Sequence, residues 1–167
     1  MAIGDSADVS IEDNTIVCAL SYDQWGILLW NGSRRVQIRR YARGNNIRGC
    51  EVGMGISNSK DVKIFGNTVT DARAPVGAFS SSTLIWIKDS QDVAVTKNYF
   101  KNADYGIQAK NLSGAGSQYV DNRFCRVNYY FVTQRILNAT PQILVQGNRD
   151  VCGGGIPPEN IPTEFPE

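Results

Sequence analysis

The stretch that decides the fold reads Lys60-Asp-Val-Lys-Ile-Phe-Gly-Asn-Thr-Val-Thr70. Val62 and Ile64 alternate with a polar residue, and Asn67 comes three positions after the second of them. Alternation with a period of two indicates a β-strand, because successive side chains of a strand point to opposite faces. The asparagine favours a turn after the strand, since Asn tolerates a left-handed backbone.

The same pattern recurs along the chain at intervals that suit a repeat architecture. It is clear in residues 8–16 and 92–100 and weaker in residues 117–124 and 142–148. A further copy keeps the apolar pair but has Tyr41 where the asparagine is expected. The markers are therefore 14, 41, 67, 98, 122 and 148, with steps of 27, 26, 31, 24 and 26 residues. A second apolar run accompanies the copies, in residues 26–30, 55–58, 84–87, 106–109 and 130–133.

Each unit contains two clear strands, and we expect a short third strand after the asparagine. Such a unit forms one rung of a coil. Stacked rungs place each strand beside its equivalent in the next rung, parallel and about 4.8 Å away. We therefore predict an all-β fold, a single parallel β-helix of about six rungs. The side chains expected to share its core are Val9, Ile11, Val36, Ile38, Val62, Ile64, Val93, Val95, Ile143 and Val145.

The repeat, a Gly-Ile pair followed by Ser-x-Asp-Val-x-Ile-x-x-Asn-x-Val, resembles that of right-handed parallel β-helix proteins. Pectate-lyase-like enzymes, alginate epimerases, NosD-like periplasmic proteins and phage tailspikes share it. The resemblance covers residues 8–150, and it implies a right-handed coil. It implies much less about function, because one fold hosts many chemistries.

We divide the 167 residues into an irregular lead-in (1–7), the coil (8–150) and a tail (151–167) that contains four prolines. No run of about 18 apolar residues predicts a membrane span, and neither a basic n-region nor an apolar h-region of a signal peptide is visible. A net charge of +1 with basic residues confined to one region argues against nucleic-acid binding. No cap precedes the first rung, so we expect a longer parent protein or a partner, such as a second copy, at that edge.

Four cysteines, Cys18, Cys50, Cys125 and Cys152, match no zinc spacing, and the chain has no histidine. We therefore expect no metal site and no cofactor. The favoured interpretation is that the cysteines are buried thiols acting as small apolar residues. The alternative is a disulfide between Cys125 and Cys152, which occupy similar corners of neighbouring rungs.

The asparagines at positions 14, 67, 98, 122 and 148 are predicted to form a structural ladder at one turn. The outward face of the strands near residues 26–30, 84–88 and 106–110 carries more chemical information. Two sets of equivalent residues are expected to point outward: first Leu28, Ser57, Trp86, Gln108 and Val132, and two positions further on Trp30, Ser59, Lys88, Lys110 and Gln134. Trp30, Trp86, Lys88 and Lys110 therefore share this face. Exposed aromatic rings stack on sugars, and cations pair with uronates or sulfates, so this face is a candidate polysaccharide site. The alternative is that long loops cover the tryptophans as a small local core.

A second candidate lies in two long turns, residues 42–54 and 71–82, which we expect to leave the coil at the same corner. They would gather five charged residues around one cleft: Arg43, Arg48, Arg73, Glu51 and Asp71. Arginine forks bind carboxylates in a bidentate manner, and a carboxylate pair can serve as acid and base at a sugar bond. The alternative is a solvated, salt-bridged surface.

The family motifs for catalysis are missing: the Gly-His-Gly of polygalacturonases, the Asp-Pro-His of alginate epimerases and a convincing acidic calcium site. The function hypothesis is thus a carbohydrate-recognition or depolymerase module for an acidic polysaccharide, outside the cell or on a virion. Any enzyme activity would be that of a polysaccharide lyase or glycoside hydrolase using Glu51 and Asp71. The alternative is a structural β-helix segment of a virion or cell-surface assembly without a ligand of its own.

Overall fold

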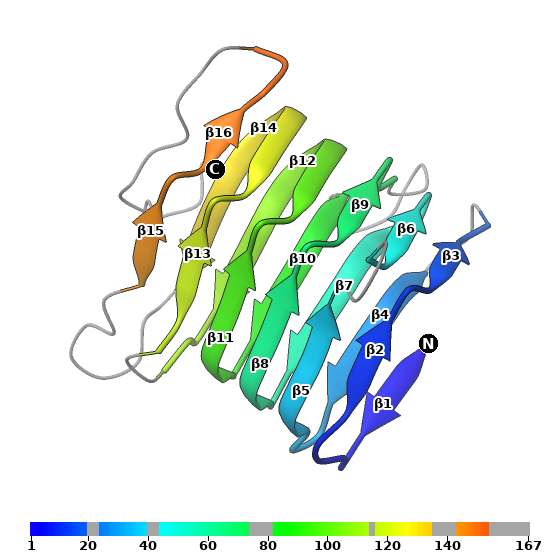
Figure 1. Cartoon of the computed structure of the whole chain (residues 1–167), viewed down its shortest axis with the longest axis vertical. Helices are drawn as coiled ribbons and strands as arrows, with labels where there is room; N and C mark the ends of the chain where they lie inside the picture. The colour runs from blue at the N-terminus through cyan, green and yellow to red at the C-terminus, as the bar shows by residue number, and fades with distance from the viewer. Residues whose placement is uncertain (20–23, 40–43, 74–81, 114–115, 135–142, 154–167) are drawn as a thin grey trace.

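A computed structural model describes residues 1–19, 24–39, 44–73, 82–113, 116–134 and 143–153 (Figure 1). All strand pairs are parallel, and no helix occurs in these ranges. The strands are β1 (Ala2–Gly4), β2 (Ser10–Glu12), β3 (Thr15–Val17), β4 (Trp25–Trp30), β5 (Arg34–Arg39), β6 (Asn46–Arg48), β7 (Val52–Ser57), β8 (Lys60–Phe65), β9 (Thr68–Thr70), β10 (Thr83–Lys88), β11 (Gln91–Thr96), β12 (Tyr99–Lys110), β13 (Gln118–Val120), β14 (Arg123–Gln134), β15 (Leu144–Gln146) and β16 (Arg149–Asp150).

The strands wind into a stacked coil with two walls (Figure 1). One wall is a six-stranded sheet in the order β15-β13-β11-β8-β5-β2. The other is a ten-stranded sheet that contains the first and third strands of each rung. In β12 and β14 the third strand of one rung continues into the first strand of the next, so each of these strands has 12 residues. The predicted all-β parallel β-helix of about six rungs is therefore confirmed.

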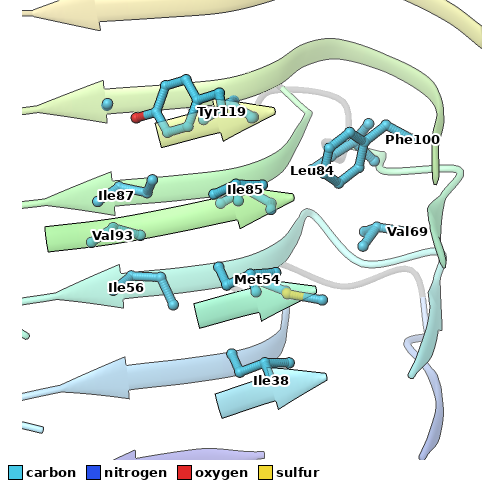
Figure 2. Close-up of a cluster of buried hydrophobic side chains, with 14 of the residues drawn as sticks. Ile38, Met54, Ile56, Val69, Leu84, Ile85, Ile87, Val93, Phe100 and Tyr119 are labelled. Atoms are coloured by element: carbon cyan, nitrogen blue, oxygen red, sulfur yellow. The ribbon is translucent and has the colours of Figure 1, made fainter. Parts of the chain in front are cut away.

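The core follows the predicted alternation. Val62 and Ile64 are fully buried, and in-register partners from β5 and β11 lie beside them. Every residue expected in the core is either buried or packed against it; Val9 and Ile143, in the outer rungs, are half-buried. Figure 2 shows side chains of the ten-stranded sheet, Ile56 and Ile87 among them, filling the space between the walls. A one-residue slip of any strand would turn its apolar side chains to solvent, so burial fixes the register.

The asparagine ladder is confirmed, with one correction. The residue that continues it in the second rung is Asn45, not Tyr41, which lies outside the described residues. Asn45 Nδ2 donates to Asn67 Oδ1 at 2.8 Å, and Asn67 Nδ2 donates to Asn98 Oδ1 at 3.1 Å. The sequence steps between Asn14, Asn45, Asn67, Asn98, Asn122 and Asn148 are 31, 22, 31, 24 and 26 residues.

A serine ladder at another corner was missed from the sequence. Ser59 and Ser90 are both buried, and each hydroxyl donates to a backbone carbonyl two residues earlier. The Ser90 hydroxyl oxygen also accepts the backbone N–H of Ser59, at 3.2 Å. Ser59, which we expected on the outer face, therefore satisfies backbone groups at a corner of the coil.

Three further expectations are wrong. Residues 1–7 are not irregular, because Ala2–Gly4 forms β1 and pairs with β4. Residues 42–54 are not one turn, because they contain β6 and the start of β7. The partner of Leu28 in the third rung is Gly55 rather than Ser57, so the register there shifts by two residues.

Both pairs of cysteines form disulfides, Cys18–Cys50 and Cys125–Cys152, with Cα atoms 4.9 Å apart in each. The favoured interpretation of free buried thiols is therefore wrong, and the alternative Cys125–Cys152 bridge is present. Stacking explains why: the third strands of neighbouring rungs run side by side, which brings cysteines in or just after these strands within bonding reach.

Candidate functional site

The predicted tryptophan and lysine residues lie on the outer face of the first strands of the ten-stranded sheet. Strand register arranges this face in rows that run along the coil. One row contains Trp25, Val52, Thr83, Tyr105 and Tyr129; the next contains Leu28, Gly55, Trp86, Gln108 and Val132. Beyond them come Ser57, Lys88 and Lys110, in line with Trp30 at the end of β4. We call this surface the aromatic face.

The two tryptophans of the prediction have different surroundings. Trp30 is 49% exposed, and its ring lies against Gly4 of the first rung. Trp86 is half-buried and meets Trp25 edge to face, with ring centroids 5.4 Å apart. A Cβ atom at Gly55 would collide with the ring of Trp25, so the two tryptophans can pack in this way only because residue 55 is glycine. Exposed Trp30 suits sugar binding, whereas Trp86 also fits a small local core.

Sequence reasoning missed a tyrosine pair on the same face. Tyr105 and Tyr129 are directly opposite each other in β12 and β14. Their rings stack with centroids 5.3 Å apart and an interplanar angle of 20°, and Tyr129 is 43% exposed. The available signal was that the two tyrosines occupy the same place in consecutive rungs. Strict alternation hid it, because each tyrosine stands two positions before an inward residue, Ile107 or Phe131, and would be expected to point inward as well.

The lysines of the prediction are brought together. Lys88 and Lys110 are directly opposite each other in β10 and β12. Lys88 Nζ lies 3.9 Å from Asp89 Oδ2, and no ion pair within the described ranges involves Lys110, which is exposed. Like charges at directly opposed positions of a sheet are destabilising, so this pair favours an anion beside it.

The arginine and carboxylate cluster is only partly assembled. Arg43 lies outside the described residues. Arg48 is exposed beside Thr70, and the backbone N–H of Arg73 donates to the Cys50 carbonyl oxygen at 3.0 Å. Glu51 and Asp71 follow the equivalent strands β6 and β9 at the same corner. The backbone N–H of Thr83 donates to the Glu51 carbonyl oxygen at 3.1 Å, so the residues that follow β6 lie beside the ends of the segment between β9 and β10. Residues 40–43 and 74–81 lie outside the described residues.

The two candidate carboxylates differ in environment. Glu51 is 5% exposed. Asp71 is half-buried and accepts a hydrogen bond from Asn102 Nδ2 at 2.6 Å. This bond, helped by Thr70 and by the nearby charges of Arg73 and Lys101, lowers the pKa of Asp71. An ionised carboxylate held in this way can accept a proton or orient a cation, but it is a poor proton donor at neutral pH.

Two findings bear on metals and membranes. In the part of the chain that the structure describes, no group of three or more histidine, cysteine, aspartate or glutamate side chains is placed to hold a metal ion. No helix in that part is long and apolar enough to cross a membrane.

Comparison with known proteins identifies a family for the coil. No curated protein and no solved structure matches the chain. The family model described as a right-handed beta-helix region matches residues 1–149, which is most of the chain, and it agrees with the parallel rungs, the asparagine ladder and the buried apolar columns. The chain therefore belongs to the right-handed β-helix family.

Proposed function

We propose that the protein binds an acidic polysaccharide along the aromatic face. The observation that carries the proposal is the opposed pair Lys88 and Lys110, with aromatic rings in the neighbouring rows. A chain of uronate or sulfated sugars supplies negative charge beside Lys110, the member of the pair that no ion pair among the described residues involves. It also presents the apolar faces of its rings to Tyr129 and Trp30, the exposed aromatic residues of the surface.

The expected energetics fit a repeating ligand. Neighbouring rungs are about 4.8 Å apart, so an extended polymer that runs along the coil axis contacts the equivalent side chains of successive rungs in turn. Each contact is weak, because exposed ion pairs contribute about 0.2–1 kcal/mol. Several together give useful affinity, and the electrostatic part weakens as salt screens the lysines.

The test is titration calorimetry with polygalacturonate at low and high salt. We expect heat of binding at low salt that declines at high salt. Lys110→Gln should weaken binding several-fold, since about 1 kcal/mol corresponds to roughly a five-fold change. Double replacement of Trp30 and Trp86 by alanine should abolish binding. The matched control is Lys101→Gln, which removes a lysine from the third-strand part of β12 and should leave binding unchanged.

Two outcomes would count against the proposal. If no acidic polysaccharide from a broad panel produces heat at low salt, the structural-segment alternative becomes the better account. If Lys101→Gln weakens binding as much as Lys110→Gln, the attraction is general and not located on the aromatic face.

Catalysis remains a prediction that rests on Glu51 and Asp71. A lyase or hydrolase activity would lower the viscosity of the polysaccharide solution over time. Asp71→Asn should remove it while leaving calorimetric binding intact, because the lysines and aromatic residues are unchanged. Binding without any fall in viscosity would identify the protein as a recognition module alone.

The proposed setting is extracellular or at a virion surface. Two disulfides persist in an oxidising compartment and are rare where thiols are kept reduced. We further propose that a partner surface, such as a second copy, covers the first rung, where β1, β2 and β3 are the terminal strands of their sheets. Val17 there is 57% exposed. Light scattering that gives only the monomer mass at high concentration would refute self-association.

A further inference from the structure

The outer face of the six-stranded sheet contains a hollow that lies away from the aromatic face. Outward side chains form two rows across this sheet. Register places Gln37, Lys63, Ala94 and Gln118 in one row, and Arg39, Phe65 and Thr96 in the other. These seven residues line a hollow of about 320 Å³.

Ala94 is the reason that the hollow exists. Its neighbours in the row are a lysine on β8 and a glutamine on β13, both with long side chains. A single methyl group between them leaves a notch about two strand spacings wide, roughly 10 Å. The volume lies near the lower end of the range for small-molecule sites, roughly 300–1,000 Å³. The notch is therefore of the size that suits one or two sugar rings.

The lining selects for negative charge. No carboxylate contributes to it, whereas Lys63 and Arg39 do. Arg39 Nε is hydrogen-bonded to Glu12 at 2.7 Å, which holds the guanidinium in place at the rim. Among the described residues, no ion pair involves Lys63, which is exposed. The adjoining hollow, toward β2, shares Gln37, Arg39 and Lys63 with this one, but its lining also contains Asp8 and Asp61. The side of the two cations that faces Phe65 is therefore the side that favours an anion.

The remaining side chains favour a sugar over a simple ion. Phe65 is 38% exposed and forms one wall. Lys97 Nζ lies 5.7 Å from the centroid of the Phe65 ring, and this contact limits the movement of the ring. Thr96 and the amides of Gln37 and Gln118 provide neutral donors and acceptors, which suit hydroxyl groups. An apolar platform, hydroxyl partners and cations on one rim match a ring that carries both hydroxyls and a carboxylate.

We infer that this hollow is a second binding site, specific for a sugar acid unit. The carboxylate of a uronate pairs with Lys63 and Arg39, and the apolar face of its ring lies along Phe65. The site is separate from the aromatic face, so it can exist whether or not a polymer binds there.

The experiment is an amide NMR titration of the intact, oxidised protein with glucuronate, glucose, acetate and sulfate in turn. Glucuronate should shift amides of β8 and β11 around the notch, and the other three should shift them much less. Ala94→Gln should abolish the response by filling the notch with a side chain that its neighbours in the row already tolerate. Lys63→Gln should weaken the response at least several-fold.

Two controls keep the outcome specific. Lys60→Gln removes a lysine from the same strand but outside the hollow, and it should leave the response unchanged. Lys110→Gln, which weakens polymer binding at the aromatic face, should also leave it unchanged. Equal shifts with sulfate or acetate would reduce the site to an adventitious anion site and overturn the inference. So would a glucuronate response that survives Ala94→Gln in a variant with an unchanged melting temperature.

Discussion

Replacement of Asn98 by alanine tests the claim that the asparagine ladder holds the rungs together. The Asn98 side chain is 1% exposed. Its Nδ2 donates to the carbonyl oxygens of Ile64 and Thr96, both at 3.0 Å, and to Asn122 Oδ1 at 3.1 Å. Its Oδ1 accepts the backbone N–H of Asn67 at 2.9 Å.

Alanine removes all of these bonds and cannot replace any of them. The backbone N–H of Asn67 is then buried without its acceptor, which costs roughly 1–3 kcal/mol, and the two carbonyls lose a donor. We therefore expect the free energy of unfolding to fall by about 3 kcal/mol, a large part of the roughly 5–15 kcal/mol that stabilises a typical domain. The assay is urea unfolding of the oxidised protein, followed by both tryptophan fluorescence and far-UV circular dichroism.

Asn128→Ala is the matched control. Asn128 is exposed, and its Nδ2 donates to Asp104 Oδ1 at 3.1 Å. Its loss should change the free energy of unfolding by less than about 0.5 kcal/mol. A loss below about 1 kcal/mol for Asn98→Ala, or equal losses for both variants, would refute the reasoning, because burial would then not determine the cost.

Three further predictions concern stability. Tyr119 is fully buried, and its hydroxyl has no hydrogen-bond partner among the described residues, so Tyr119→Phe should raise the free energy of unfolding by about 1 kcal/mol in the same assay. A fall in this free energy would reveal a buried partner such as water. Asp71 has a folded-state pKa below its ordinary 3.8 because Asn102 donates to it, so it stabilises the fold above that pH, and the contribution disappears as pH falls through the folded value. Acid titration should therefore destabilise the wild type more than Asp71→Asn, and parallel curves would contradict this. Replacing Cys125 and Cys152 by serine opens a loop with a sequence separation of 27 and should cost about 3–4 kcal/mol, measured by thermal unfolding against the oxidised wild type.

The inward half of the fold could be predicted from the sequence because burial constrains it. Val62 and Ile64 have to face the core, and the same pair recurs wherever a rung passes the six-stranded sheet. The corners are less constrained, since segments of different length can join the same two strands. An even spacing predicts the ladder residue of the second rung at position 41, but the segment between β5 and β6 places it at Asn45. The register error at Gly55 has a similar cause, because a glycine can replace an outward side chain without loss to the core.

The candidate site was harder to predict, because outward residues obey no common rule. Alternation alone placed Lys88 and Lys110 on one face, and the structure makes them direct neighbours. It could not show that Trp86 meets Trp25, since that contact depends on the missing side chain at Gly55. The notch at Ala94 was also invisible, because a small residue matters only when its neighbours in adjacent rungs are known.

The position of the disulfides determines how the coil responds to a pulling force. Cys18–Cys50 ties the first rung to the second, and Cys125–Cys152 ties the fifth to the sixth. An end rung has one neighbour and an inner rung has two, so a stacked coil without cross-links opens from its ends. The two bonds secure these ends, and tension applied at the termini is passed to the rungs between Cys50 and Cys125. Those rungs repeat after 22, 31 and 24 residues, so each one that opens lengthens the chain by roughly 75 to 105 Å. A reducing agent would shift the first opening from the middle of the coil to its two ends.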